Sequence, residues 1–212
     1  MKVLVVGSGA REHALCWKLR HSPIVKELYC APGNVGMAKI ADRVPIDPSS
    51  IVELADFAAT IKIGLTVVGP ELPLSLGIVD EFQKRDLPIF GATQAAGEIE
   101  SSKVFAKEFM KKHKIPTARF EVCGSAGETR AVLKKWKEGF PVVLKADGLA
   151  SGKGVILARD KKEAEQAIEI LQVERRFGVA SDRVVVEEFL EGFEASFFAL
   201  SDGQRVLPLV TC

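Results

Sequence analysis

The sequence predicts an α/β protein whose first half is a doubly wound parallel sheet. Over residues 1–100, short β-branched runs alternate with amphipathic stretches, which is the pattern of a parallel sheet covered by helices. After Gly91 the pattern changes to a basic helical stretch, a proline and further β-branched runs, which indicates a second compact unit. We therefore expect one domain over residues 1–100 and another over residues 101–212.

The first domain is expected to contain three strands and three helices. Each strand candidate is a short run rich in β-branched residues or leucine, as packed sheets prefer, and each helix candidate is amphipathic. Ser49 and Ser50 are favoured capping residues for the second helix. The strands are expected at residues 3–6, 28–30 and 65–68, and the helices at residues 12–20, 50–62 and 75–85.

The second domain is expected to open with a basic helix at residues 101–113, which Pro116 separates from the next strand. The last two strands are joined by Ser201-Asp202-Gly203, where Asp-Gly suits a tight turn. Because the chain stops directly after a strand, we expect the remainder of the protein to be absent. The strands are expected at residues 117–121, 142–146, 155–158, 184–187, 195–200 and 205–210, and two further helices at residues 128–137 and 162–171.

The composition indicates a cytoplasmic protein that binds neither nucleic acid nor membranes. Lysine and arginine total 29 against 28 acidic residues, so there is no overall positive field to attract a polyanion. The apolar run near the N-terminus is too short for the core of a signal peptide or for a membrane span. The four cysteines lack CxxC spacing and are expected to be reduced thiols: Cys16, Cys30, Cys123 and Cys212.

The first candidate site is the loop after the first strand. Gly7-Ser8-Gly9-Ala10 leads into a helix, whose free N–H groups favour an anion. Glu12 stands where the dinucleotide-binding GxGxxG motif has its third glycine, so that motif is incomplete. Arg11, Glu12 and His13 are side chains that can bind a phosphorylated substrate. A tight turn that merely connects strand and helix explains the loop equally well.

The second candidate site follows the third predicted strand. Gly69-Pro70-Glu71 lies just past the carboxyl end of that strand, which is where ligands bind in open parallel sheets. Glu71 is placed to orient an amine or a hydroxyl group. The alternative is a rigid turn before the next helix.

The strongest signal is the stretch FPVVLKADGLASGKGVILA. A buried strand delivers Lys145, a loop follows, and a second strand begins at Val155. Phosphate oxygens need positive charge and unobstructed N–H donors, both of which a lysine and a glycine-rich loop provide. The loop joins two strands, so it is not a Walker motif, and a plain hairpin is the alternative. The loop residues that carry this pattern are Gly148, Ser151, Gly152, Lys153 and Gly154.

A group of acidic residues follows the strand at residues 184–187. Glu187 and Glu188 stand at the end of this strand, and Leu190 and Glu194 come next. A nucleotide site needs an acceptor for the adenine amine, a backbone donor for the ring and a carboxylate for the ribose. These residues can supply all three, although each glutamate alone is more often a solvated surface charge.

Together these stretches resemble the glycinamide ribonucleotide synthetase (phosphoribosylamine–glycine ligase) family, ATP-grasp enzymes of de novo purine synthesis. The resemblance covers essentially the whole chain. It rests on GSGAREHA at residues 7–14, APGN at 31–34, GPELPL at 69–74, SSKVFAKEFM at 101–110, KADGLASGKGV at 145–155 and EEFLEGFEAS at 187–196.

The resemblance implies that glycine is activated by ATP to a glycyl phosphate, which the amine of 5-phosphoribosylamine attacks to give glycinamide ribonucleotide, ADP and phosphate. Mg²⁺ bridges the ATP phosphates. The resemblance also implies an incomplete ATP-grasp domain at residues 101–212 with a small lid subdomain at about 120–190. Other enzymes of the purine pathway are possible partners.

The resemblance further assigns roles to the candidate residues. Lys103 and Lys145 would be catalytic and contact the ATP phosphates, while the loop 147–154 closes over them. Glu187 would accept from the adenine amine, Leu190 would contact the ring through its backbone, and Glu194 would bind the ribose. The residues expected at the nucleotide are Lys103, Lys145, Asp147, Gly148, Ser151, Gly152, Lys153, Gly154, Glu187, Glu188, Leu190 and Glu194, and those expected at phosphoribosylamine are Gly7, Ser8, Gly9, Arg11, Glu12, Gly69, Pro70 and Glu71.

The chain departs from the family in two ways. Ala10 replaces a glycine that is common in the first loop, which is tolerated where φ is negative. The family's magnesium ligands and much of its glycine site lie beyond Cys212, so we expect no metal ligands in this chain and no activity from it alone.

Three other interpretations stay open. One is another ATP-grasp carboxylate–amine ligase or a carboxylase, against which GSGAREHA and GPELPL argue. The second is a nucleotide-binding module without catalysis. The third is a dehydrogenase that binds a nicotinamide cofactor at residues 7–9.

Overall fold

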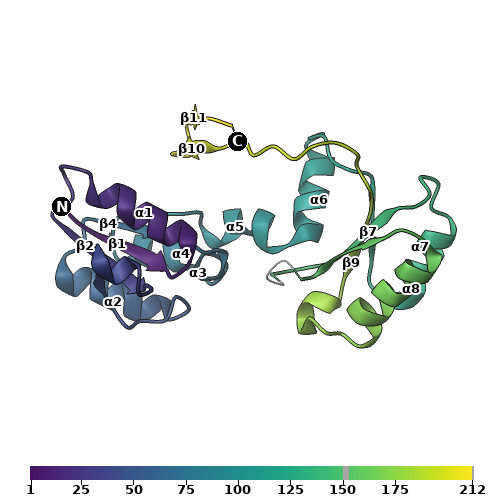
Figure 1. The fold of residues 1–212 in the computed structure, drawn as a ribbon, viewed down its shortest axis with the longest axis horizontal. Coiled ribbons are helices and arrows are strands. Elements are labelled where there is room, and N and C mark those ends of the chain that lie inside the picture. The colour runs from purple at the N-terminus through teal and green to yellow at the C-terminus, as the bar shows by residue number, and fades with distance from the viewer. Residues whose placement is uncertain (150–152, 212) are drawn as a thin grey trace.

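The computed structural model describes residues 1–149 and 153–211, which form two α/β units followed by a hairpin (Figure 1). The first unit has a five-stranded, fully parallel sheet in the order β3-β2-β1-β4-β5. Its strands are β1 (Lys2–Gly7), β2 (Glu27–Pro32), β3 (Asp42–Arg43), β4 (Leu65–Val68) and β5 (Ile89–Phe90). Its helices are α1 (Ala10–Arg20), the 3-10 helix η1 (Met37–Lys39), α2 (Ile51–Ile61), α3 (Glu71–Ser75) and α4 (Ile78–Lys84).

Apolar residues on both faces of β1 hold this sheet between helices. Leu4 and Val6 pack on one face with residues of α2 and α4. Val3 and Val5 point to the other face, where Cys16 of α1 and Met37 of η1 cover them. Successive side chains of a strand alternate between faces, so a continuous apolar run is what a sheet covered on both faces requires. The prediction of a doubly wound parallel sheet is confirmed.

The strand order creates a crevice at one edge of the first sheet. The chain moves from β1 to β2 and β3 on one side, and then returns to place β4 and β5 on the other side of β1. In open α/β sheets, ligands bind outside the carboxyl ends of strands at such a reversal of direction. The loops that follow β1 and β4 therefore meet at the position where a ligand is expected.

The second unit is a four-stranded antiparallel sheet in the order β6-β9-β7-β8. Helices α7 and α8 cover one face of it. Helices α5 and α6 lie between the two sheets (Figure 1). The elements are α5 (Gln94–Ser101), α6 (Lys103–Lys112), β6 (Phe120–Cys123), α7 (Ala126–Lys134), β7 (Val142–Ala146), β8 (Val155–Ala158), α8 (Lys161–Ile168), the π-helix η2 (Glu169–Val173), the 3-10 helix η3 (Gly178–Ser181) and β9 (Val184–Glu188).

The pleat of the second sheet separates a core face from an open face. On β7, Val142, Leu144 and Ala146 are buried in the core under α7 and α8. Since neighbouring side chains point to opposite faces, Lys145 is directed away from those helices. On β9, Val186 belongs to the same core and Glu187 follows on the other face. The core thus orients both charged side chains toward one side.

The chain closes with a short hairpin, β10 (Ala199–Ser201) and β11 (Val206–Pro208), which lies beside the first unit (Figure 1). The strands expected at residues 195–200 and 205–210 are therefore shorter than predicted. Both strands are exposed on both faces. No helix within the described ranges is long and apolar enough to cross a membrane. Cys16, Cys30 and Cys123 are buried free thiols, and Cys212 lies outside the described residues.

Several predicted boundaries are wrong for local reasons. The helix expected at residues 75–85 is α4, which begins only at Ile78 because Gly77 takes a left-handed φ of 85°, and the short helix α3 before it was not predicted. The helix expected at 101–113 begins at Lys103, after the N-cap Ser102, and the helix α5 before it was not predicted. The strand expected at 117–121 is β6, whose pairing with β9 places it at Phe120–Cys123.

We expect Leu4→Ala to destabilise the first unit by about 2–5 kcal/mol, because the fully buried Leu4 leaves a cavity in a sheet packed on both faces. Urea unfolding followed by circular dichroism measures the change. Val52→Ala is the matched control, since Val52 is exposed on α2 and should give a much smaller effect. Equal losses for the two variants would show that the two-sided core does not stabilise the sheet as described.

Candidate functional site

The loops after β1 and β4 meet at the crevice of the first sheet. The register pairs Val6 of β1 with Val68 of β4, so the residues that follow each strand are neighbours. The Gly69 N–H donates to the Val6 carbonyl at 3.0 Å, which extends this pairing to the loop. The structure thus brings together all eight residues predicted at the substrate: Gly7, Ser8, Gly9, Arg11, Glu12, Gly69, Pro70 and Glu71.

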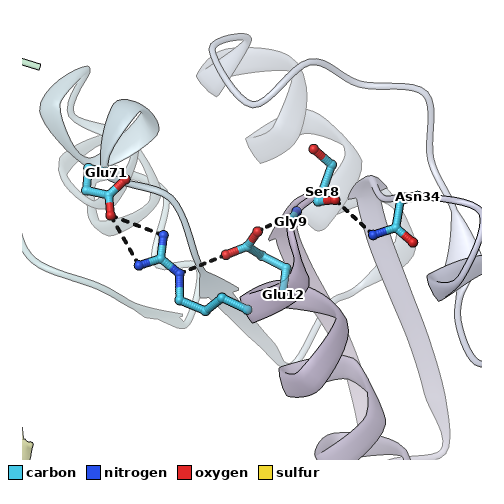
Figure 2. Close-up of polar contacts among 6 residues, drawn as sticks. Ser8, Gly9, Glu12, Asn34 and Glu71 are labelled. Atoms are coloured by element: carbon cyan, nitrogen blue, oxygen red, sulfur yellow. Dashed lines mark hydrogen bonds and ion pairs between the residues drawn. The ribbon is translucent and has the colours of Figure 1, made fainter. Parts of the chain in front are cut away.

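Glu12 is buried beneath these loops. Only 3% of the residue is exposed. Its Oε2 accepts a hydrogen bond from the Gly9 N–H at 2.7 Å, and its Oε1 accepts one from Arg11 Nε at 3.0 Å (Figure 2). Both oxygens of this carboxylate are therefore used to hold the protein itself.

Arg11 connects Glu12 to Glu71 across the crevice. Arg11 Nη1 and Nη2 each lie 3.1 Å from Oε1 of Glu71 (Figure 2). The pKa of the Glu71 carboxyl is lowered, first by a hydrogen bond from its own N–H at the start of α3 and then by Arg11. Glu71 is thus a carboxylate at neutral pH, and its partly exposed side chain is able to accept further hydrogen bonds.

Asn34 holds the β1 loop from the other side. Its Nδ2 donates to the Ser8 carbonyl at 2.8 Å (Figure 2), and its Oδ1 accepts from the Met37 N–H at 2.9 Å. Asn34 belongs to the APGN stretch but was not predicted as a site residue. An asparagine beside a glycine in a loop is a common turn signal, so its contact with a distant loop is visible only in the structure.

A cleft of about 610 Å³ lies where α3, α5 and α6 approach the open face of the second sheet. Its charged lining comes from separate parts of the chain. Glu71 belongs to the first unit, Glu100 of α5 and the α6 lysines 103 and 107 contribute from between the sheets, and Lys145 and Glu187 come from the second sheet. Gly148 of the predicted phosphate loop also lines it. One candidate substrate residue, Glu71, therefore shares a cavity with four candidate nucleotide residues, which are Lys103, Lys145, Gly148 and Glu187.

Lys103 is held against the predicted phosphate loop. Its Nζ donates to the Gly148 carbonyl at 2.8 Å. Burial lowers the pKa of the Lys103 ammonium, and the neighbouring Lys145 lowers it further, while Asp147 opposes the shift. Glu100 and Glu187 also oppose the shift, so burial is the main cause of the lowered pKa, and a partly dehydrated ammonium interacts with an incoming phosphate more strongly than a fully solvated one.

Lys145 and a third lysine share one buried carboxylate. Lys145 Nζ lies 2.8 Å from Oε2 of Glu187, and Lys107 Nζ lies 3.3 Å from the same oxygen. Lys107 also donates to Thr117 Oγ1 at 2.7 Å. The other oxygen of Glu187, Oε1, is buried without a hydrogen-bond partner among the described residues. Glu187 therefore keeps one acceptor position for a ligand.

Lys107 was not predicted as a site residue. It lies four positions after Lys103 on α6, and residues at this spacing occupy the same face of a helix. That spacing was the available signal in the sequence.

Asp147 joins the start of the loop to the start of α6. Its Oδ1 accepts from Ser102 Oγ at 2.9 Å and from the Val104 N–H at 3.1 Å, and its Oδ2 lies 2.6 Å from Arg183 Nη2. The carboxylate thereby satisfies a free N–H group in the first turn of the helix. This contact sets the position of α6, and with it Lys103, relative to the strand end that carries Lys145.

The other predicted nucleotide residues do not line this cleft. Glu188 accepts a hydrogen bond from the Arg119 N–H at 2.8 Å, which extends the pairing of β6 with β9. Leu190 and Glu194 are exposed beyond the end of β9. Lys153 is exposed, and the buried Gly154 accepts from the Ala146 N–H at 2.8 Å. The predictions at Ser151 and Gly152 lie outside the described residues.

The cleft is suited to a polyanion. Lys103, Lys107 and Lys145 all line it, Lys107 and Lys145 share the buried carboxylate of Glu187, and the loop approaches through Gly148. Glu71 and Glu100 are its other two carboxylates. Mg²⁺ would need oxygen ligands such as grouped carboxylates rather than lysines. Within residues 1–149 and 153–211, no three His, Cys, Asp or Glu side chains stand together as a metal site.

Comparison with known proteins gives concordant matches for both parts of the chain. Residues 1–100 match the family described as "Phosphoribosylglycinamide synthetase, N domain", and residues 101–212 match "Phosphoribosylglycinamide synthetase, ATP-grasp (A) domain". Phosphoribosylamine–glycine ligase from Ralstonia nicotianae is 52% identical over 213 residues, and that from Escherichia coli is 48% identical. All of this chain is covered, but only 50% and 49% of these relatives, so the chain spans about half their length.

Solved structures give the same result. The crystal structure of phosphoribosylamine–glycine ligase from Thermotoga maritima matches with a TM-score of 0.79 and 33% identity, over 99% of this chain and 49% of that one. N5-carboxyaminoimidazole ribonucleotide synthetase from Thermus thermophilus matches with a TM-score of 0.73 and 19% identity, over 99% of this chain and 53% of that one. At this low identity the second match shows a shared fold only.

We expect Asp147→Ala to destabilise the second unit by about 1–3 kcal/mol, because it leaves the Val104 N–H and Ser102 hydroxyl without their acceptor. Urea unfolding measures the loss, and faster hydrogen exchange at the Val104 amide reports its location. Asp56→Ala is the control, because this carboxylate pairs with Arg85 in an exposed surface salt bridge. Unchanged exchange at Val104 would contradict the proposed junction.

Proposed function

The chain belongs to the phosphoribosylglycinamide synthetase family, and we propose that the protein to which it contributes ligates glycine to 5-phosphoribosylamine with ATP. The products are glycinamide ribonucleotide, ADP and phosphate. The observation that supports this best is the cleft in which Glu71 of the first unit faces Lys103 and Lys145. Because the chain spans half of its relatives, the activity belongs to a protein that also contains the remainder, and residues 1–212 alone are expected to be inactive.

The residues that line the cleft support different roles for the two units, with substrate binding in the first and ATP binding in the second. Residues 1–100 form the substrate domain, and residues 101–212 are an incomplete ATP-grasp domain with a lid subdomain at about 120–190. Lys103 and Lys145 bind the phosphates, and the loop 147–154 closes over them. The free Oε1 of Glu187 accepts from the adenine amine. Leu190 and Glu194 contact the ring and ribose after the exposed segment beyond β9 moves toward the nucleotide.

The reaction requires positioning and charge neutralisation rather than a protein nucleophile. A glycine carboxylate oxygen attacks the γ-phosphorus of ATP, and ADP leaves with the electrons of the broken bond. The phosphoribosylamine nitrogen then attacks the glycyl carbonyl carbon, phosphate departs, and the nitrogen loses a proton. The two ammonium groups stabilise the negative charge on the phosphoryl oxygens. Glu71 orients the attacking amine by accepting its hydrogen bond.

The remaining properties follow from the family rather than from this cleft. Mg²⁺ would neutralise the phosphates, but the described residues do not supply a metal site, so no step is assigned to it. We propose a cytoplasmic location and small-molecule substrates, with other purine-pathway enzymes as possible partners. Glycine-dependent release of ADP by the intact protein in the presence of phosphoribosylamine tests the function directly. ADP release without glycine, or none at all, would refute it.

We expect Lys145→Ala in the intact protein to lower ATP turnover by about 100- to 1,000-fold, equivalent to about 2.7–4 kcal/mol, the scale for losing one preorganised electrostatic contact. Steady-state kinetics measures the change. Lys137→Ala, which removes an exposed lysine from the same unit, should leave turnover unchanged. The role assigned to Lys145 is wrong if both variants keep wild-type turnover.

The pH dependence of ATP binding should depend on Lys103. Because burial lowers its pKa, its ammonium loses a proton at a lower pH than an ordinary lysine, and ATP affinity should therefore weaken early as pH rises. Arginine keeps its charge over this range. In the intact protein, Lys103→Arg should shift this alkaline loss of affinity to higher pH, as measured by KM for ATP against pH. Identical alkaline limbs in the two proteins would contradict the assignment.

A further inference from the structure

Three glycines around the β1 loop leave space for one side chain, that of Glu12. A Cβ added to Gly69 would lie 2.2 Å from Oε1 of Glu12, and one added to Gly7 would lie 2.5 Å from its Cγ. A Cβ on Gly9 would lie 2.9 Å from Oε2. The ends of two strands and the start of α1 thus surround a single carboxylate. Glu12 is only 3% exposed to solvent.

This carboxylate occupies the position where a βα loop usually binds phosphate. The first N–H groups of a helix, together with the glycine loop before it, attract anions. Here the Gly9 N–H already donates to Glu12 at 2.7 Å, and Arg11 lies against the same carboxylate. An incoming phosphate would therefore find the Gly9 N–H already occupied, and the negative charge of Glu12 would repel it.

We propose that Glu12 is a specificity-determining residue that closes the β1 loop to phosphate by acting as its resident anion. The edge of the first sheet then accepts an uncharged or cationic group that donates hydrogen bonds, and the phosphate of a substrate is held elsewhere. This assignment replaces the expectation that Glu12 binds a phosphorylated substrate directly. It also gives a physical reason for a glutamate in the third-glycine position of GxGxxG, because a pyrophosphate at this loop would compete with it.

Glu71, the other carboxylate at the crevice, is also suited to a group that donates hydrogen bonds. Glu71 is ionised and partly exposed, and it lines the cleft that also contains Lys103 and Lys145. An amine that donates to Glu71 would therefore face the phosphate-binding lysines. Assigning that amine to phosphoribosylamine depends on the proposed function, whereas the closed anion position depends only on the contacts of Glu12.

The test is a titration of the 212-residue chain with inorganic pyrophosphate, followed through the amide resonance of Gly9. In the wild-type chain we expect no saturable shift at Gly9. In Glu12→Ala and Glu12→Gln we expect a shift that saturates at a pyrophosphate concentration about tenfold or more below the highest one at which the wild type still shows no saturation, because a like charge has been removed. Glu12→Gln preserves the shape of the side chain and decides the matter if the alanine variant does not fold. The Gly148 amide reports separately on pyrophosphate in the lysine cleft.

Glu53→Ala is the matched control. Glu53 occupies the third position of α2, as Glu12 does in α1, but it is exposed. Its removal should leave the Gly9 response unchanged. A saturable shift at Gly9 in the wild type as strong as in the Glu12 variants, or no shift in either variant, would overturn the proposal.

A kinetic readout in the intact protein separates this role from a structural one. Glu12→Gln should raise KM for phosphoribosylamine while leaving KM for ATP unchanged, whereas simple destabilisation would lower the amount of active enzyme and move neither constant. An equal rise in both constants would count against the proposal. If the intact protein shows no glycine-dependent ADP release at all, the proposed function fails, and the pyrophosphate titration still decides the role of Glu12.

Discussion

The carboxylate of Asp147 joins the two elements that carry the cations of the cleft. It accepts from Ser102 and Val104 at the start of α6 and pairs with Arg183 before β9. Lys103 is the first residue of α6, and Lys145 stands two residues before Asp147 on β7. One side chain therefore controls the separation of two lysines that are far apart in sequence. Without it, the Val104 N–H in the first turn of α6 would lose its acceptor, and α6 would lose its link to the strand end that carries Lys145.

Glu187 is the buried carboxylate that pairs with two of the three lysines of the cleft. Lys145 and Lys107 share its Oε2, so the cations are held near the open face of the sheet before any phosphate arrives. A buried ion pair of this kind contributes little net stability, but the loss of one partner is costly because the other charge stays buried. We interpret this group as preorganisation: the protein has already desolvated and positioned the cations that a polyanion needs.

Local sequence signals predicted the elements that depend on local physics. The β-branched runs identified β1, β4, β7 and β9, and the glycine-rich stretches identified the loops at both sites. The break at Gly77 and the two-residue strands β3 and β5 were missed, because a positive φ and a short edge pairing leave no hydrophobic period. The sharing of Glu187 by Lys107 and Lys145, and the burial of Glu12 among glycines, were also missed. Both depend on contacts between segments that the sequence does not show to be neighbours.

The most direct test of the central claim is covalent labelling with an acyl-phosphate derivative of ATP, which transfers its acyl group to lysines beside the terminal phosphate. Mass spectrometry of the labelled intact protein locates the modified residues. The convergence of α6 and β7 on one cleft predicts labelling at Lys103 and Lys145 that excess ATP suppresses, with exposed lysines such as Lys137 unaffected by ATP. ATP-protected labelling that falls on lysines outside this cleft, with Lys103 and Lys145 unmodified, would contradict the account.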